Sequence, residues 1–349
     1  MPTEQQVLDA LRNVMDPELG RNIVEIGMIR DLKVSAKGEV SFTLALTIPD
    51  CPMRDQIARE ARKAAQGVPG VTKVDLTLGA MNDEERKAAI GSAQVALPKL
   101  NPFNKIGQAI AILSGKGGVG KSSVTARLAV ALAKQGQKVG ILDADITGPS
   151  IPKLFGLPSG GLRGSEQGIL PGVSGLGIRI VSTNLLVPEE DTAVIWRGPM
   201  ITSAIKQFWS DVLWGKLDTL LIDLPPGTSD ATLTVMQSLP LNGIILVTTP
   251  QQLASLVVRK AVHMIQQMNV PILGVVENMS YFTCPDTGKQ HAIFGPSHAE
   301  EIAKAAGVQV AVRLPLDPLI ATLGDQGKIE EASLEGMDAV TALVMQPKA

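Results

Sequence analysis

The sequence predicts an α/β protein of about two domains, the larger with a mostly parallel sheet covered by helices on both faces. Chain length is the first indication, because 349 residues exceed what one small hydrophobic core usually organises. The second is an alternation, from Ala109 onward, of short apolar segments with helical patterns. The third is that those segments are apolar almost without interruption, as strands buried on both faces are.

The elements of the larger domain follow in order along the chain. Strands are predicted where apolar runs are bounded by turn residues, at 109–113, 139–142, 220–222, 244–248, 272–276 and 308–314. Helices are predicted where apolar residues recur at helical spacing, at 122–135, 253–268 and 297–306. The Gly- and Pro-rich stretch 156–177 is expected to be a mobile surface insertion.

Residues 1–80 form a smaller predicted α/β domain with the element order α-β-β-α-β. Its first helix starts at a capping box formed by Thr3 and Gln6. The elements that follow are strands at 29–34 and 40–48, a helix at 53–65 and a strand at 71–78. Residues 81–106 are expected to be a linker, so that the second domain spans 107–349.

Composition and charge disfavour several classes of partner. A net charge of −2 and an aromatic content of 3% provide neither the basic surface nor the stacking platform of a nucleic-acid binder. No apolar run approaches the roughly 20 residues needed to cross a bilayer, and the N-terminus has no signal- or transit-peptide pattern. Cys51 and Cys284 are too few for a disulfide scaffold, so we expect a cytoplasmic protein without nucleic-acid or membrane partners.

The strongest chemical signal is a glycine-rich loop between a predicted strand and a predicted helix. It matches G-x-x-x-x-G-K-[ST] and consists of Gly115, Lys116, Gly117, Gly118, Val119, Gly120, Lys121 and Ser122, followed by Ser123. In such a loop the backbone N–H groups face phosphate oxygens, and the helix adds its positive N-terminal end. Lys121 is expected to contact the β- and γ-phosphates of a nucleotide, and the Ser122 hydroxyl to bind Mg²⁺. The alternative is a glycine-rich turn without a ligand.

Carboxylates stand at the ends of two predicted strands, where an open α/β sheet presents its ligand site. Asp143 and Asp145 follow one strand, and Asp223 ends another. Each is a candidate for the nucleotide site. Each also has the alternative of capping the helix that follows its strand.

A second lysine in the loop, Lys116 in K-G-G-V-G-K-S, resembles the deviant Walker A group of MinD, ParA and nitrogenase-iron-protein ATPases. The resemblance implies a homodimer that sandwiches ATP, with Lys116 reaching the partner's nucleotide. It also implies that Lys116, Lys121 and Asp145 are catalytic, Asp145 by orienting the attacking water, and that Asp223 holds Mg²⁺. A solvated loop lysine is the alternative for Lys116.

The same resemblance assigns residues around the rest of the nucleotide. Gly227, in P-P-G, would offer its N–H to the γ-phosphate. Asn278 matches the asparagine that reads adenine in this group, and Pro315 would flank the base. For Asn278, a turn-forming role is the alternative.

Further segments resemble the Mrp/ApbC family of iron–sulfur cluster carrier ATPases over residues 105–345. They are D-A-D-I-T-G-P-S-I-P from Asp143, W-R-G-P-M from Trp196, D-L-P-P-G-T-S-D from Asp223 and V-E-N-M-S from Val276. The resemblance implies an ATP-hydrolysing carrier or assembly factor for iron–sulfur clusters. Iron–sulfur scaffolds and recipient apo-proteins would be its partners.

The first 80 residues resemble the small SufT-type iron–sulfur-assembly domain that commonly precedes this ATPase. The similarity lies in D-P-E from Asp16 and T-I-P-D-C-P from Thr47.

Cys284 lies where this chain departs from the family's cluster motif. The family has Cys-x-x-Cys after V-E-N-M-S, whereas this chain has C-P-D-T, with Thr287 in place of the second cysteine. A [4Fe–4S] cluster bridging a dimer needs four thiolates, and a threonine hydroxyl is a poor iron ligand. Three outcomes stay open: Cys284 binds a cluster weakly with help from Asp286, His291 or an external thiol; two copies each of Cys284 and Cys51 complete the set; or cluster binding is lost.

Two other classes of function stay open. A MinD- or ParA-like regulatory or positioning ATPase without a cluster would need a membrane or DNA surface, which the acidic C-terminal segment 330–349 and the charge balance disfavour. A nucleotide-locked scaffold would not need Lys121 and Asp145, which are both present.

Overall fold

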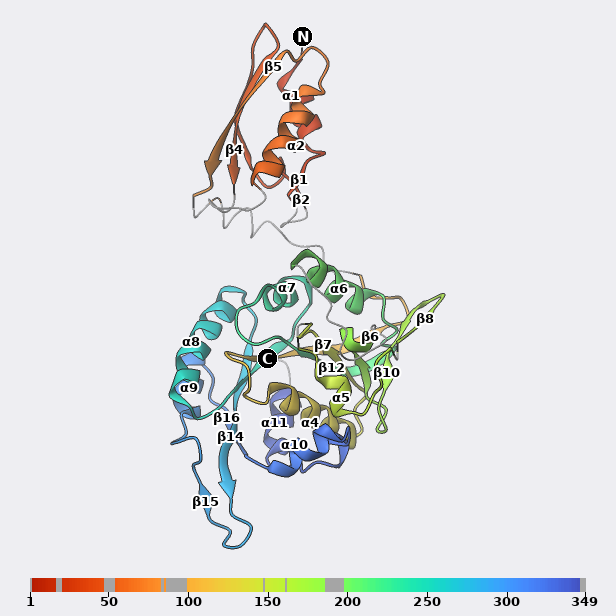
Figure 1. Cartoon of the computed structure of the whole chain (residues 1–349), viewed down its shortest axis with the longest axis vertical. Helices are drawn as coiled ribbons and strands as arrows, with labels where there is room; N and C mark the ends of the chain where they lie inside the picture. The colour runs from red at the N-terminus through yellow and green to blue at the C-terminus, as the bar shows by residue number, and fades with distance from the viewer. Residues whose placement is uncertain are drawn as a thin grey trace. The chain divides into compact units, whose positions relative to one another are not determined.

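A computed structural model gives the fold, and it describes residues 2–16, 21–46, 54–82, 85, 99–146, 148–160, 162–185 and 198–345. The chain forms two compact units, Met1–Ala96 and Leu97–Ala349 (Figure 1). Each unit has its own hydrophobic core.

The N-terminal unit packs two helices against a three-stranded sheet. Its main elements are α1 (Glu4–Leu11), β3 (Ile29–Val34), β4 (Glu39–Leu46), α2 (Arg54–Gln66) and β5 (Lys73–Ala80). Strand β4 pairs antiparallel with β3 and parallel with β5. These elements follow the predicted order, and the capping box of Thr3 and Gln6 is present at the start of α1. The structure adds an antiparallel pair of two short strands, β1 (Met15–Asp16) and β2 (Arg21–Asn22). Strands of two residues are too short to show a periodic pattern, so the sequence did not predict them.

The second unit is built on a nine-stranded sheet. In spatial order the strands are β10 (Gly172–Val173), β11 (Arg179–Val181), β7 (Val139–Asp143), β12 (Lys216–Asp223), β6 (Lys105–Ser114), β13 (Gly243–Thr248), β14 (Ile272–Thr283) and β15 (Gln290–His291), with β16 (Ala311–Pro315) also paired to β14. Pairing is parallel from β11 through to β16 and antiparallel only for β10 and β15. The predicted mostly parallel sheet is therefore confirmed.

Helices cover both faces of this sheet (Figure 1). One core contains residues of α4 (Lys121–Lys134) and α11 (Met337–Met345), and the other those of α6 (Gly198–Ser210), α7 (Asp230–Ser238), α8 (Gln252–Gln267) and α9 (Ala299–Ala306). Strand β6 shows why its sequence is apolar without interruption. Ile110 and Ile112 belong to the first core, whereas Ala109, Ala111 and Leu113 belong to the second.

The stretch 156–177, expected to be a mobile insertion, carries short strands. A hairpin of β8 (Arg163–Ser165) and β9 (Gly168–Leu170) precedes β10 at the sheet edge. Leu170 and Val173 are exposed, so the surface position fits the expectation. Strands of two or three residues are too short to show an alternating pattern, and for this reason the sequence analysis did not predict them.

Parallel pairing brings the carboxyl ends of the central strands to one edge of the sheet. The register sets Asp223 at the end of β12 beside Asp143 of β7 and Ile112 of β6. On the other side of β6, Ser114 pairs with Val247 of β13. The loop that follows β6 thus has a strand end on each side, which is the usual place of a ligand site in an open α/β sheet.

No helix in the described part of the chain combines the length and the apolar character that a bilayer crossing requires.

Candidate nucleotide-binding site

The glycine-rich loop joins β6 to α4 and borders a cavity. Two of its glycines, Gly118 (φ 77°) and Gly120 (φ 76°), have left-handed backbone conformations, which residues with a Cβ rarely adopt. Gly120 is restricted in a second way, because a Cβ there would lie 2.4 Å from Nδ2 of Asn278. The cavity has a volume of about 290 Å³ and is lined by Ser114, Lys116, Gly117, Gly118, Val119, Gly120, Lys121, Ser122, Ser123, Asp145, Ser150, Leu154 and Pro226.

Helix α4 begins at Lys121, directly after this loop. Its first turn contains no acidic residue, and two hydroxyl residues, Ser122 and Ser123, line the cavity with Lys121. An uncompensated helix N-terminus that follows a glycine loop presents N–H groups and a positive field to an anion. The loop and helix therefore form a cradle for phosphate.

Asp223 is the centre of a buried polar cluster at the base of this cradle. Its Oδ2 lies 2.7 Å from Nζ of Lys121 and accepts a 2.6 Å hydrogen bond from the Ser122 hydroxyl. Its Oδ1 accepts a 2.7 Å hydrogen bond from the hydroxyl of Thr125, a residue that the sequence analysis missed. A threonine four positions after the loop lysine faces the same side of α4, which is the only signal that could have indicated it.

This cluster has the chemistry of a magnesium site. A hydroxyl from Ser122 and a carboxylate from Asp223 are oxygen ligands of the kind that Mg²⁺ prefers, and the two side chains already touch. Both residues stand beside Lys121, where the phosphates of a nucleotide would lie. The structure thus brings together the three residues that the sequence analysis assigned to Mg²⁺ and phosphate.

The two aspartates after β7 differ in environment. Asp143 is fully buried and accepts hydrogen bonds from the N–H groups of Asp145 and Ile151 and from the Ser182 hydroxyl. Burial, and then the charge of Asp223, raise the pKa of the Asp143 carboxyl to about 8. Ile151 is the first residue of the short helix α5 (Ile151–Leu154), whose N-cap is Ser150, so the Asp143 carboxyl bonds to the start of the helix without occupying the cap position. Asp145 lines the cavity.

Lys116 and Gly227 are both engaged within the chain. The Lys116 ammonium donates a hydrogen bond to the Gln251 side chain, which follows β13. Gly227, with φ 78°, donates its N–H to the Ser114 carbonyl at 2.8 Å. That N–H would have to leave Ser114 before it could bind a phosphate.

Asn278 reaches the loop from β14. Its side-chain N–H₂ donates a 2.9 Å hydrogen bond to the Val119 carbonyl, and only 6% of the residue is exposed. Pro315 ends β16, where it pairs with Tyr281 of β14. The structure therefore places Asn278 against the glycine-rich loop, but neither Asn278 nor Pro315 is among the residues that line the cavity.

Cys284 directly follows β14, the strand that carries Asn278, in the segment that leads to β15. Figure 1 shows that β14 and β15 form a hairpin. The hydroxyl of Thr287, followed by the backbone N–H groups of Thr287 and Asp286, lowers the pKa of the Cys284 thiol. Within the described residues no group of three or more His, Cys, Asp or Glu side chains could hold a metal ion. Cys51, with its T-I-P-D-C-P segment, lies outside the described residues, as do Trp196 and Arg197.

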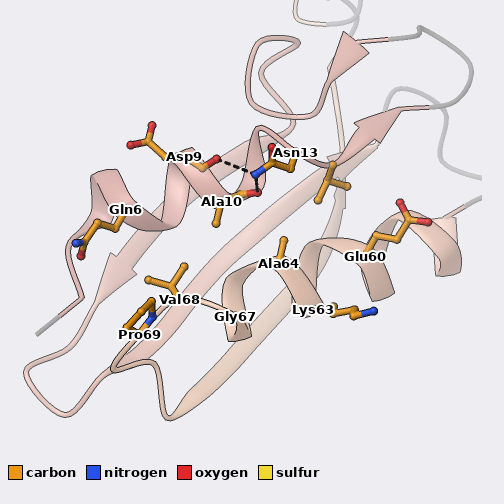
Figure 2. Close-up of a pocket in the computed structure, with 11 residues that line it drawn as sticks. Gln6, Asp9, Ala10, Asn13, Glu60, Lys63, Ala64, Gly67, Val68 and Pro69 are labelled. Carbon is orange, nitrogen blue, oxygen red and sulfur yellow. Dashed lines mark hydrogen bonds between the residues drawn. The ribbon is translucent and has the colours of Figure 1, made fainter.

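The N-terminal unit has a larger hollow of about 700 Å³ between α1 and α2 (Figure 2). Its floor is apolar, with Ala10, Ala64 and Val68, and Asp9 and Glu60 stand at its rim. By volume alone, this hollow would be a better candidate for the nucleotide site than the cavity beside the glycine-rich loop. It lacks the glycine loop and the Lys–Asp–Ser cluster that suit phosphate and Mg²⁺, so we place the nucleotide in the second unit.

Comparison with known proteins gives matches for both units. A family model described as NUBPL iron-transfer P-loop NTPase matches residues 105–346, and one described as iron-sulfur cluster assembly protein matches residues 4–76. An iron-sulfur cluster carrier protein of Synechocystis sp. is 42% identical over 353 residues, covering 99% of this chain and 97% of that protein. One of Methanocaldococcus jannaschii is 50% identical over 226 residues, covering 64% of this chain and 78% of that protein.

Among solved structures, a nucleotide-binding protein of Archaeoglobus fulgidus in complex with ADP is similar to the second unit. It is 48% identical in sequence, with a TM-score of 0.58, and the match covers 65% of this chain and 88% of that one.

Proposed function

Since this chain belongs to the NUBPL iron-transfer P-loop NTPase family, we propose that it hydrolyses ATP in order to carry iron–sulfur clusters to recipient apo-proteins. The resemblance to the iron–sulfur cluster carrier family is supported by the family models and by relatives named iron-sulfur cluster carrier protein. ATP hydrolysis, the dimer and the cluster are proposals.

The buried cluster of Lys121, Ser122 and Asp223 is the observation that carries the ATPase proposal. Lys121 would stabilise negative charge on the β- and γ-phosphates, while N–H groups of the loop hold their oxygens. Ser122 and Asp223 would hold Mg²⁺, which, when bound, neutralises phosphate charge. Asp145 lines the same cavity and would orient the attacking water.

A homodimer is supported by the supply of cluster ligands. A [4Fe–4S] cluster is held by four thiolates, and the described part of one chain provides a single cysteine, Cys284. Two chains would therefore have to contribute, with Cys51 or an external thiol completing the set. Lys116 lines the cavity on the same unit, and in the dimer it would exchange Gln251 for the partner's nucleotide.

Phosphate release from ATP and Mg²⁺ by the full chain tests the ATPase proposal. We expect turnover in the wild type and a loss of about 100-fold or more in Asp145→Asn, the size of an acid–base contribution. Sedimentation of Asp145→Asn with ATP should then show a dimer. Equal turnover in the two proteins would contradict the assignment of Asp145, and no turnover in the wild type would contradict the ATPase proposal.

We propose that the protein acts in the cytoplasm with iron–sulfur scaffolds and apo-proteins as partners. The partners follow from the name of its relatives, iron-sulfur cluster carrier protein, and the location is the one expected from the sequence.

A further inference from the structure

Strand β14 bulges within its V-E-N-M-S segment. Binding of phosphate or Mg²⁺ does not require this irregularity. Strands β14 and β16 pair regularly at Val276 with Val312 and at Glu277 with Arg313, and the next pair is Tyr281 with Pro315. Between these two pairs Asn278, Met279 and Ser280 therefore stand opposite Leu314 alone. Such extra residues bend a strand and re-aim a side chain, and they are frequent beside functional sites.

The bulge contains a strained residue. Met279 has a φ of 56°, in the left-handed region where a side-chain-bearing residue is unfavourable. Such a conformation persists only when the surroundings impose it. The residues around Met279 must therefore hold the bulge in shape.

Three side chains hold it. The Ser280 hydroxyl donates a hydrogen bond to Oε2 of Glu277, across the base of the bulge. Arg313 Nε, from β16, donates to the same hydroxyl at 2.9 Å and lies 4.0 Å from Oε2 of Glu277. The guanidinium also lies over the ring of Tyr281, 5.8 Å from its centroid, so Arg313 contacts both ends of the bulge.

Glu277 is the buried anchor of this cluster, with no exposed surface. A buried carboxylate is stable only when it is paired and hydrogen-bonded. Beyond Ser280 and Arg313, its Oε1 accepts a 2.8 Å hydrogen bond from the N–H of His298, the residue that precedes α9. The N-terminus of that helix adds a favourable field, so the carboxylate is fixed from two elements.

The bulge places the Asn278 amide against the backbone of the glycine-rich loop. This amide is bonded to the Val119 carbonyl and fills the space that a Cβ on Gly120 would need. Met279 shares this contact, because the same Cβ would lie 3.2 Å from its terminal methyl group. A small rotation of the bulge would withdraw the amide from the loop.

We propose that Glu277, Ser280 and Arg313 are positioning residues that fix the Asn278 amide and thereby set the preference for an adenine nucleotide. The proposal rests on the proposed ATPase function and on the adenine-reading role that the family resemblance implies for Asn278. An amide held in one orientation discriminates bases by its donor and acceptor pattern, whereas a mobile amide can turn to suit either purine.

Binding of the fluorescent nucleotides mant-ADP and mant-GDP to the full chain, with Mg²⁺, tests this. We expect the wild type to prefer mant-ADP. In Ser280→Ala the ratio of the two Kd values should narrow by about tenfold, the size of one misplaced hydrogen bond. Ser280→Thr, which keeps the hydroxyl, should restore the ratio, and Thr283→Ala, an exposed control on the same strand, should leave it unchanged.

Arg313→Gln provides a second variant if Ser280→Ala does not fold, because the Arg313 side chain is half-exposed. A wild type without adenine preference, or a ratio unchanged in both variants, would overturn the proposal. Equal weakening of both nucleotides would also overturn it, since that outcome reports general loosening. Because binding is read without turnover, failure of ATP hydrolysis and failure of base selection are distinguishable.

Discussion

Nζ of Lys121 lies 2.7 Å from Oδ2 of Asp223, and both side chains are buried, with 6% and 0% of their surfaces exposed. The lysine proposed to bind phosphate and the carboxylate proposed to bind Mg²⁺ are thus paired with each other in this structure. When a nucleotide and Mg²⁺ bind, the phosphates would contact Lys121 and the metal would contact Asp223. The same two residues therefore contribute to folding as well as to the proposed chemistry.

Replacing Lys121 by alanine should lower stability as well as abolish ATP turnover. Removing one partner of a buried ion pair leaves the other charge uncompensated, which costs about 3 kcal/mol. Urea unfolding of Lys121→Ala should show this loss. Asp145→Asn, at a partly buried position, should lose turnover with little change in the unfolding free energy. If Lys121→Ala is as stable as the wild type, the buried pair does not exist as described.

The Thr125 hydroxyl should matter for the proposed magnesium site. It donates to Oδ1 of Asp223 at 2.7 Å, and a hydrogen bond to a charged group contributes about 1.5–3 kcal/mol. Thr125→Val should therefore destabilise the protein and weaken the dependence of nucleotide binding on Mg²⁺. Thr125→Ser keeps the hydroxyl and is the matched control. Identical Mg²⁺ titrations for valine and serine variants would rule out a role for this contact.

Thr249, directly after β13, should be replaceable by valine with a gain in stability. Its hydroxyl is buried and, among the described residues, has no hydrogen-bond partner within the protein. Removing an unsatisfied buried hydroxyl recovers about 1 kcal/mol of desolvation. Thr248→Val is the control, because that hydroxyl donates to the Thr249 carbonyl at 3.4 Å and should not yield the same gain. Thermal unfolding of both variants would decide, and a lower melting temperature for Thr249→Val would refute the expectation.

The pH at which the alkylation rate of Cys284 is half its maximum should lie below the pKa of an ordinary cysteine thiol. Hydrogen bonds from the Thr287 hydroxyl, then from two N–H groups, favour the thiolate and lower the pKa. The thiolate is the reactive form, so the rate rises with pH and levels off above the pKa. Iodoacetamide kinetics in a Cys51→Ser background should show Thr287→Val moving the midpoint to higher pH. Thr283→Val, on the same hairpin, should leave it in place.

An unchanged midpoint in Thr287→Val would mean that Thr287 does not hold the thiolate. A midpoint at higher pH in Thr287→Val would show that Thr287 stabilises the thiolate, although a threonine hydroxyl is itself a poor iron ligand. Thr287 would then keep the single described cysteine ionised and ready to bind iron.

The sequence was most informative where local pattern and motif agree, and least where distant segments meet. The strand, loop and helix around Lys121 were predictable because an apolar run, glycines and a helical pattern are contiguous. Strand β14 was predicted to end at Val276 because polar Asn278 and Ser280 interrupt the apolar run, yet the strand resumes after the bulge. The contact of Thr125 with Asp223 depends on the packing of α4 on β12, and the spacing of Thr125 from Lys121 is its only trace in the sequence.

The role of Asp143 also could not be decided from the sequence. Its place at a strand end allowed a ligand or a capping role, and only the fold shows that its carboxylate bonds to the start of α5. Asp145, two residues later, lines the cavity instead. Which of the two aspartates faces the cavity depends on the backbone path from β7 into the loop. Neither the spacing nor the composition of the sequence specifies that path.

Counting the iron and sulfide bound per dimer after anaerobic reconstitution shows whether the protein holds a cluster. We expect about four of each for the wild type, a loss of both in Cys284→Ala, and transfer of the cluster to a recipient apo-protein. Cys51→Ala, measured in parallel, shows whether the N-terminal cysteine completes the ligand set. A wild type that retains no iron would contradict the proposal that this ATPase carries an iron–sulfur cluster.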